Sequence, residues 1–146
     1  MGVHSMKDMP STPAKGLVFT KVWKREDPRD VLILRTAKHL SELREDAVIA
    51  TGSKRRAFQL LKLRPDLQII NIRGNVDTRL RKMEEQQLDG IVLAAAGLKR
   101  LGMEDVITQY LAPEDMISAP AQGALALEVR EDQKELQKML DVFCDE

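Results

Sequence analysis

The sequence predicts an α/β fold with a mostly parallel sheet that is covered by helices on both faces. Three apolar runs of strand length, residues 47–50, 67–72 and 90–95, each give way to a turn. A segment with the helical spacing of apolar residues follows each turn. This alternation favours parallel pairing, because a parallel connection has to cross back over the sheet and usually does so as a helix.

The remaining elements follow from local patterns. Apolar or alternating stretches predict strands at residues 2–4, 17–23, 31–34 and 124–129, and helical spacing predicts helices at residues 39–44, 54–63, 76–87, 97–101, 106–111 and 133–143. The helix at 54–63 follows Ser53, which can cap it, and ends before Pro65. Residues 24–30, K-R-E-D-P-R-D, form a polar breaker that we interpret as a hinge.

Composition excludes several classes of function. The 146 residues carry no net charge at pH 7 and only 3% are aromatic, so neither a broad basic surface nor stacking platforms for nucleic acid are expected. No apolar run approaches the roughly 20 residues of a membrane helix. Cys144 is the single cysteine, and His4 and His39 lack metal-ligand spacing. We therefore expect a cytoplasmic protein without a metal, membrane or nucleic-acid partner.

Basic residues gather where the predicted strands end. The clusters are T-G-S-K-R-R at residues 51–56, R-G-N-V-D-T-R-L at residues 73–80 and A-G-L-K-R-L-G at residues 96–102. The carboxyl ends of parallel strands form the usual ligand site of an α/β fold. Arginine suits carboxylates and phosphates there, because its planar set of donors matches two oxygens at once. The pattern therefore favours a polyanionic ligand at this edge of the sheet.

Each cluster also has a plain structural interpretation. Residues 54–56 occupy a predicted first helical turn, where each cation opposes the helix dipole by about 0.3–1 kcal/mol, and on that cluster alone a ligand and a solvated turn are equally favoured. Arg79 reaches the site only if the start of its helix faces it, and Lys99 with Arg100 fits a surface pair equally well. Because a basic residue follows each of three strand ends, we favour a ligand-binding site over solvated surface charge.

The start of the chain adds a single carboxylate to these cations. Lys7 and Asp8 lie in V-H-S-M-K-D-M-P, and one acid among many bases indicates a substrate whose reacting centre becomes positive. Gln122 and Gly123 lie in the turn A-P-A-Q-G-A, which could supply backbone donors, although such a turn is more often only a crossover. Arg81, by contrast, is best interpreted as an ordinary exposed helix residue.

Five motifs in order closely resemble those of hydroxymethylbilane synthases, also called porphobilinogen deaminases. They are V-H-S-M-K-D-M-P, R-E-D-P-R-D, T-G-S-K-R-R, R-G-N-V-D-T-R-L and L-A-A-A-G-L-K-R-L-G. The resemblance implies α/β domains of the periplasmic-binding-protein-like (type II) kind. It implies that residues 1–27 and 118–146 belong to a partial first domain, that residues 28–117 form a nearly complete second domain, and that the family's C-terminal domain is absent.

The resemblance also implies the reaction and the roles of the site residues. Four porphobilinogen molecules are joined head to tail with loss of ammonia, on a dipyrromethane cofactor held by a cysteine. Catalysis is assigned to Asp8 and Lys7, with Asp8 stabilising the positive charge that develops as ammonia leaves. The implied cofactor-binding residues are Lys7, Asp8, Ser53, Arg55, Arg56 and Arg79. The implied substrate-binding residues are Arg73, Arg79, Arg100, Gln122 and Gly123.

The chain departs from the family's pattern in three places. Gly52 and Lys54 stand in a motif that is usually T-S-S-L-R-R, and Pro120 and Ala121 stand in one that is usually A-V-G-Q-G-A. The cofactor-bearing cysteine of the family lies in a glycine-rich loop of the C-terminal domain, and Cys144 does not match it. We therefore interpret Cys144 as a half-buried helix residue.

Three interpretations follow for the chain as a whole. It is expected to be a fragment of a usually monomeric synthase, inactive by itself, that self-associates through uncovered sheet edges. It could instead be a small-anion binding module of the same fold, or a degenerate, non-catalytic fragment. Asp8 favours the enzyme over the anion-binding module, because a simple anion binder gains nothing from a carboxylate among its arginines.

Overall fold

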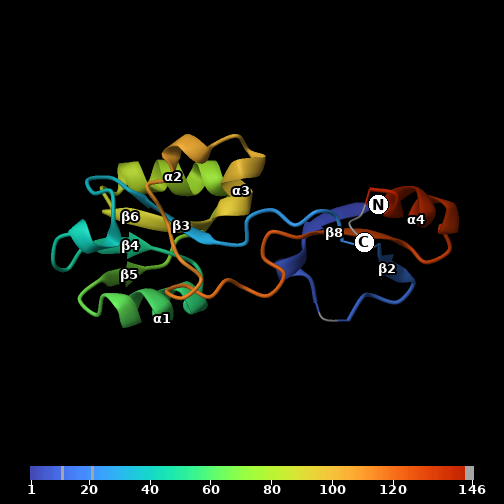
Figure 1. The fold of residues 1–146 in the computed structure, drawn as a ribbon, viewed down its shortest axis with the longest axis horizontal. Coiled ribbons are helices and arrows are strands. Elements are labelled where there is room, and N and C mark those ends of the chain that lie inside the picture. Colours follow the sequence, from blue (N-terminus) through green and yellow to red (C-terminus); the bar gives the residue numbers. More distant parts are fainter. Residues whose placement is uncertain (11, 21, 144–146) are drawn as a thin grey trace. The chain divides into compact units, whose positions relative to one another are not determined.

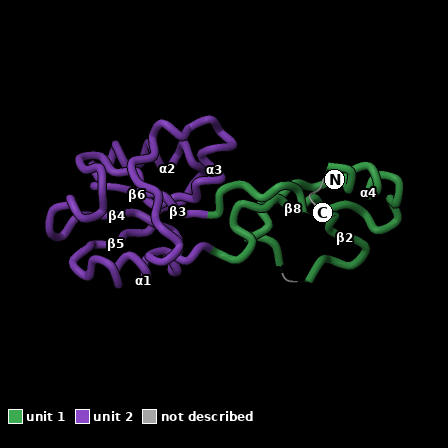
Figure 2. Tube along the Cα trace, in the orientation of Figure 1, with its two compact units in different colours: residues 1–28, 119–146 green, residues 29–118 purple. Residues whose placement is uncertain are grey.

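The chain forms two compact units, which the computed structural model describes over residues 1–10, 12–20 and 22–143. Unit 1 combines Met1–Pro28 with Ala119–Glu146, and unit 2 is the continuous stretch Arg29–Ser118 (Figure 2). The polar breaker around Pro28 therefore lies at the first passage between the units. The sequence had placed the two passages after residues 27 and 117, and the units divide after residues 28 and 118.

Unit 2 is built on a five-stranded sheet of order β5-β4-β6-β3-β7 (Figure 1). Its strands are β3 (Asp30–Leu34), β4 (Val48–Ala50), β5 (Gln68–Ile70), β6 (Gly90–Ala94) and β7 (Gln109–Tyr110). Strand β4 lies between β5 and β6 and pairs in parallel with both, which places Ala50 opposite Ile70 and Ile91. The carboxyl ends of these three strands therefore share one edge of the sheet.

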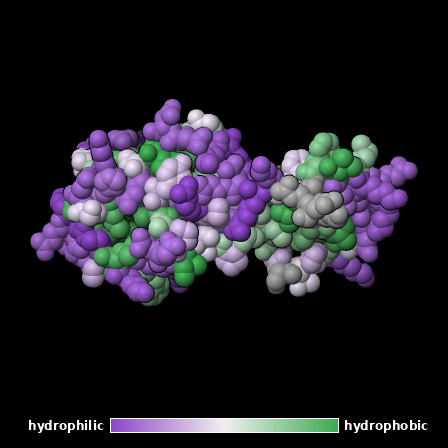
Figure 3. Space-filling model, in the orientation of Figure 1, coloured by the Kyte–Doolittle hydropathy of each residue, from purple (hydrophilic) through white to green (hydrophobic). Residues whose placement is uncertain are grey.

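Helices cover both faces of this sheet. Helix α1 (Lys54–Leu63) lies on one face, and α2 (Val76–Glu85) and α3 (Ala95–Arg100) lie on the other (Figure 1). Leu60 of α1 packs in a core with Leu32 and Ile49, whereas the α2 and α3 face is filled by a second cluster that includes Met83 and Leu98. Two cores arise because successive strand side chains point to opposite faces. Hydrophilic side chains predominate on the visible outer surface of unit 2 (Figure 3).

Unit 1 contains a three-stranded sheet of order β1-β8-β2. β1 (Gly2–Ser5) and β2 (Leu17–Phe19) both pair antiparallel with β8 (Leu125–Arg130), whose Leu127 and Val129 are buried. A short 3₁₀ helix, Met6–Asp8, follows β1, and α4 (Lys134–Asp141) follows β8. The rings of Trp23 and Phe143 lie 6.0 Å apart between centroids. β8 is therefore the centre of unit 1.

The expectation of a mostly parallel sheet is wrong. β3 pairs antiparallel with β6 and with β7, and the described strands of unit 1 pair only in the antiparallel direction. Only a 3₁₀ helix, Leu40–Glu42, lies between β3 and β4, where a longer helix had been expected at 39–44. Because β4 is parallel to β6 and β6 is antiparallel to β3, β4 runs opposite to β3, a direction that needs no crossover helix in the connection between them.

The helix expected at residues 106–111 is also absent from the structure. A 3₁₀ helix, Glu104–Val106, is followed instead by β7. The Thr108 hydroxyl donates to Leu32 O (2.9 Å) and accepts from Leu34 N (3.1 Å), which ties the segment to β3. This tertiary contact outweighs the local helical spacing. Within the described residues, no helix has both the length and the apolar character needed to cross a membrane.

Candidate functional site

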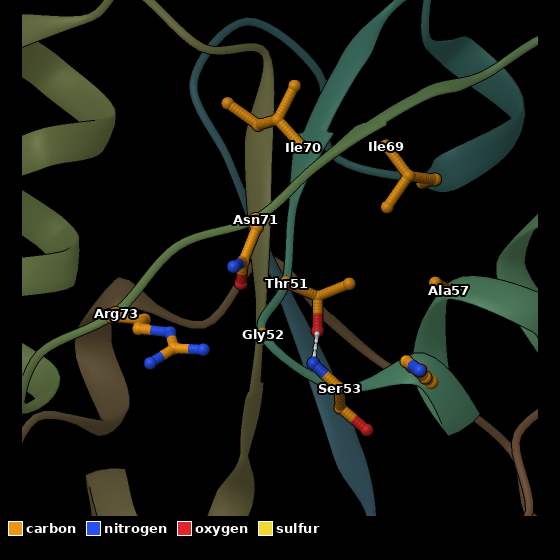
Figure 4. Close-up of a pocket in the computed structure, with 9 residues that line it drawn as sticks. Thr51, Gly52, Ser53, Ala57, Ile69, Ile70, Asn71 and Arg73 are labelled. Carbon is orange, nitrogen blue, oxygen red and sulfur yellow. Dashed lines mark hydrogen bonds between the residues drawn. The ribbon is translucent and has the colours of Figure 1, made fainter.

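A pocket of ≈ 360 Å³ lies at the carboxyl ends of β4 and β5. It is lined by Thr51, Gly52, Ser53, Lys54, Ala57, Ile69, Ile70, Asn71 and Arg73 (Figure 4). Two of these side chains, Lys54 and Arg73, are cations, and none of the nine is acidic. The isoleucines supply an apolar wall beside this charge. The pocket can therefore hold an anion that also has an apolar body.

The turn after β4 is shaped to start a helix at the pocket. The buried Thr51 hydroxyl accepts from Ser53 N at 3.2 Å, and Ser53 Oγ in turn accepts from Arg56 N at 3.4 Å (Figure 4). Backbone N–H groups in the first turn of a helix favour an anion. A Cβ atom at Gly52 would lie 2.8 Å from Ile72 O, so the serine of the usual motif does not fit this backbone without a shift. The glycine thus permits a close approach between two turns.

Arg55 and Arg56 meet at one buried carboxylate, that of Asp30. Arg56 Nε donates to Asp30 Oδ1 at 2.9 Å, and Arg55 Nη1 donates to Asp30 Oδ2 at 2.7 Å. Arg56 Nη1 also donates to Val92 O at 3.3 Å. The side chain of Arg56 is 6% exposed and that of Arg55 is 26% exposed. Arg56 is therefore the inner member of the pair, and Arg55 is the member that solvent or a ligand reaches more easily.

Arg79 joins this cluster from the second turn of α2. Its Nε donates to Gly74 O at 2.7 Å, in the turn that precedes the helix. Burial lowers the pKa of Arg56, the carboxylate of Asp30 opposes this shift, and the charges of Arg55 and Arg79 lower the pKa further. Arg55 and Arg79 thus both lie within electrostatic range of the Arg56 guanidinium, which Asp30 binds. The surplus of positive charge favours binding of an anion.

Arg100, the last of the expected arginines of unit 2, lies further from the strand ends than the others do. Arg100 is the final residue of α3, at the opposite end of that six-residue helix from β6. At about 1.5 Å per helical residue, this puts its backbone several ångströms from the strand edge that Ser53 and Arg73 share. The structure brings residues 51–56 together with Arg73 and Arg79, and the role of Arg100 stays a prediction.

The expected residues of unit 1 lie around the crossover turn. Lys7 Nζ lies 3.4 Å from Gln122 Oε1, and Gln122 Nε2 donates to Pro28 O at 2.6 Å. Asp8 is exposed at the end of the 3₁₀ helix. Gly123 has a φ of 92°, and a Cβ atom there would lie 2.3 Å from Glu26 O. The turn therefore requires a glycine at this position, whereas Gln122 holds Lys7.

Sequence reasoning missed Asp30 and Asn71. Asp30 appeared only as the end of the polar breaker, although an acid directly before four apolar residues was a signal that its carboxylate is buried. Asn71, which lines the pocket, carried no signal beyond its place after a strand. In the described parts of the chain, no group of three or more histidine, cysteine, aspartate or glutamate side chains is arranged to hold a metal ion. Cys144 lies outside the described residues.

A comparison with protein families identifies the family of the chain. The family model described as "Porphobilinogen deaminase, dipyromethane cofactor binding domain" matches residues 1–138. The chain belongs to the porphobilinogen deaminase family. This confirms the resemblance carried by the five motifs and identifies dipyrromethane as the cofactor of the matching domain. The interpretation as a separate small-anion binding module is not supported.

Porphobilinogen deaminases of several bacteria are similar over the whole chain. The identity is 60% with that of Lachnospira eligens, 54% with that of Clostridioides difficile and 53% with that of Bacillus subtilis, each over 100% of this chain. These alignments cover 50%, 49% and 47% of the three relatives. The chain thus spans about half the length of the curated relatives it matches.

Solved structures show the same fold at much lower identity. A lipoprotein of Bacillus subtilis matches with a TM-score of 0.59 and 11% identity, over 90% of this chain and 62% of that protein. A lipoprotein of Actinomyces odontolyticus matches with a TM-score of 0.55 and 12% identity, over 87% and 59%. The α/β, periplasmic-binding-protein-like fold class predicted from the sequence is therefore confirmed.

Proposed function

We propose that this chain supplies the cofactor- and substrate-binding residues of a hydroxymethylbilane synthase, which joins four porphobilinogen molecules with loss of ammonia. The observation that supports this most is the cationic strand edge of unit 2, in a chain of the porphobilinogen deaminase family. Each pyrrole of the substrate carries two carboxylates, so a growing chain of pyrroles needs many cations around it. The surplus of arginine over acid at this edge meets that need.

The donor set of unit 2 fits the carboxylates of dipyrromethane. Ser53 at the start of α1 carries a hydroxyl at the end of β4, and the guanidinium groups of Arg55 and Arg56, which bind Asp30, belong to the same helical turn. Guanidinium groups bind carboxylates through two parallel hydrogen bonds. When bound, the cofactor supplies the pyrrole carbon on which the product grows. These residues would hold its acidic side chains, and Lys7 would add one further cation.

Asp8 is proposed as the catalytic carboxylate. Its side chain is exposed at the end of a rigid 3₁₀ turn that follows β1. A fixed negative charge lowers the energy of a transition state in which positive charge develops, as happens when ammonia leaves. Lys7, held by Gln122, lies next to it in the chain and would keep an acidic group of the ligand in place.

The arginines that follow β5 and β6 are proposed to bind substrate. Arg73 lines the pocket and Arg79 adds its charge to the Asp30 cluster, so both can receive acetate or propionate groups. Arg100 is kept for the same role. Gln122 and Gly123 contribute to substrate binding by shaping the crossover turn that holds Lys7.

A chimera tests this function directly. These 146 residues would replace the matching residues of the Bacillus subtilis relative, which is 53% identical. The chimera should convert porphobilinogen to hydroxymethylbilane, and Arg73→Leu should raise KM strongly. Arg81→Leu is the matched control, because Arg81 lies eight residues further on, on the exposed side of α2, and is paired with Glu85 at 3.1 Å. A folded chimera without turnover, or equal effects of both substitutions, would contradict the proposal.

A further inference from the structure

We propose that Asp30 is a positioning residue, whose buried carboxylate holds Arg55 and Arg56 in the geometry that receives the ligand's carboxylates. This inference rests on the proposed function, since it assigns a support to two of its binding residues. Asp30 itself does not contact the ligand in this proposal. Its effect on binding is transmitted through the two guanidinium groups.

The geometry of α1 makes such a support necessary. Consecutive helical residues project about 100° apart, so two neighbouring arginines do not converge unless a partner lies between them. Asp30 is that partner, because Oδ1 binds Arg56 and Oδ2 binds Arg55. Its position is fixed by the sheet, where Asp30 lies opposite Ala94 and its carbonyl accepts from Leu111 N at 3.0 Å.

Burial makes the support rigid. The Asp30 side chain is fully buried, and Arg56 is almost so. A buried ion pair whose oxygens all have donors resists exchange with water, and removing one partner leaves an uncompensated charge. Arg55 is anchored on a second side as well, because its Nη1 donates to Ile117 O. The two arginines are therefore oriented before any ligand arrives.

A second buried aspartate provides a matched comparison. Asp89 directly precedes β6, whereas Asp30 lies opposite the last residue of that strand, so the two acids mark opposite ends of β6. Asp89 binds Arg44 through Nε and Nη2, at 3.3 and 2.7 Å, and accepts from Val48 N. Both aspartates are buried members of arginine pairs in unit 2. Only Asp30 binds arginines that are assigned to the ligand.

The direction in which Asp30→Asn changes the affinity for the ligand distinguishes a positioning role from a purely electrostatic one. If Asp30 only offset positive charge, Asp30→Asn would strengthen binding of an anion, because the site would become more positive. If Asp30 were only structural, its removal would lower stability, as at Asp89, and leave binding unchanged. Positioning predicts weaker binding although the net positive charge rises.

The experiment titrates the full chain with a free dipyrromethane that carries acetate and propionate groups, the ligand that Arg55 and Arg56 are proposed to hold, well below the melting temperature of each variant. Asp30→Asn should weaken binding about tenfold, the loss expected when a charged hydrogen bond is no longer aligned. Asp89→Asn should bind as the wild type does, with a comparable loss of thermal stability. Unchanged or tighter binding by Asp30→Asn, or equal weakening by Asp89→Asn, would overturn the proposal.

An NMR measurement tests the positioning role of Asp30 without depending on ligand binding. The Nε–H signal of Arg56, which donates to Asp30 Oδ1 and is assigned by its loss in Arg56→Lys, should exchange slowly with water in the wild type and fast in Asp30→Asn. Wild-type protein that fails to bind the dipyrromethane contradicts the proposed function, and the exchange rates then decide about Asp30. Equal exchange rates in both proteins would refute the positioning role.

A second pair of variants tests the proposal if Asp30→Asn does not fold. Arg56→Met combined with Asp30→Asn leaves no buried charge without a partner, and such replacements are often tolerated. Compared with Arg56→Met alone, the double variant differs only in the acid that anchors Arg55. The double variant should bind the dipyrromethane several-fold more weakly than the single one. Equal affinity of the two would refute the proposal.

Discussion

Gln122 binds Lys7 with one end of its amide group and the carbonyl of Pro28 with the other. The distances are 3.4 Å from Lys7 Nζ to Oε1 and 2.6 Å from Nε2 to Pro28 O. The side chain is 1% exposed, so water cannot readily replace either partner. Arg25 Nε also donates to the backbone carbonyl of Gln122 at 2.9 Å. A single residue thus fixes the cation next to Asp8 and the end of the first segment of unit 1.

Gln122→Met should therefore destabilise unit 1 specifically. It leaves the buried Pro28 contact unmade, at a cost of about 1–3 kcal/mol. Amide hydrogen exchange should show reduced protection of β8 and unchanged protection of β4 and β6. Lys7→Met, which removes the longer contact and leaves the one to Pro28 O in place, is the control and should cost less. Equal losses in the two variants would show that the Pro28 contact contributes little.

Ala121→Gly should stabilise unit 1. Ala121 has a φ of 57°, in the left-handed region that costs a residue with a Cβ atom about 1–2 kcal/mol. Glycine, which the family's usual motif has here, adopts this conformation without that cost. Chemical denaturation should show a gain of about 1 kcal/mol. Ala119→Gly, outside the left-handed region, should give no gain, and a loss at Ala121 would contradict the argument.

Asp8→Asn should abolish turnover by the chimera without unfolding it. The amide keeps the size of the side chain and removes the charge that stabilises a developing cation. Because Asp8 is exposed, we expect the melting temperature to change little. Product formation should fall by several orders of magnitude, as electrostatic stabilisation of a transition state is often the largest contribution to catalysis. Near-normal turnover would remove Asp8 from the mechanism.

The Arg64–Asp66 pair should make unit 2 sensitive to acid. Hydrogen bonds from Arg64 Nε (2.8 Å) and Nη2 (2.6 Å) lower the pKa of Asp66 from 3.8 to about 2. A carboxylate with a lowered folded-state pKa contributes its stability above the unfolded pKa and loses it as the pH falls through the folded one. The contribution is therefore complete above about pH 4 and is lost toward about pH 2.

Urea denaturation between pH 5 and pH 2 would measure this effect. The wild type should exceed Asp66→Asn in stability at the upper end, and the difference should shrink as the pH falls. Asp132→Asn is the control, because Asp132 pairs with Arg130 in unit 1 and should not affect the unfolding of unit 2. A difference at Asp66 that does not depend on pH would contradict the assigned pKa.

Elements whose ends are marked by neighbouring residues could be predicted from the sequence. α1 begins and ends at the predicted residues, Lys54 and Leu63, because Ser53 caps its start and Pro65 follows its end. β7 could not be predicted, since the contact of Thr108 with β3 joins residues 76 apart in sequence. Pairing direction was equally hidden, because it depends on where a connection runs and not on the composition of the strand.

In the candidate site, too, the residues marked by local signals were predicted and the residue that acts through a distant contact was not. The arginines after β4 and β5 were predictable, because strand ends and helix starts can be read locally. The partner that holds two of them was not, since Asp30 is 25 and 26 residues away from Arg55 and Arg56. Sequence reasoning thus found the groups that bind a ligand and missed the group that aligns them. The latter depends on how α1 packs over β3.

The order of strands in unit 1 has a consequence for synthesis of the chain. β1 and β2 both pair with β8, and the whole of unit 2 is encoded between β2 and β8. As the chain leaves the ribosome, unit 2 can close its own sheet while β1 and β2 still lack β8. A nascent chain halted at residue 118 would thus carry one folded unit and two strands whose β8-facing edges are open to pairing with other chains. Synthesis of β8 pairs both of these edges at once.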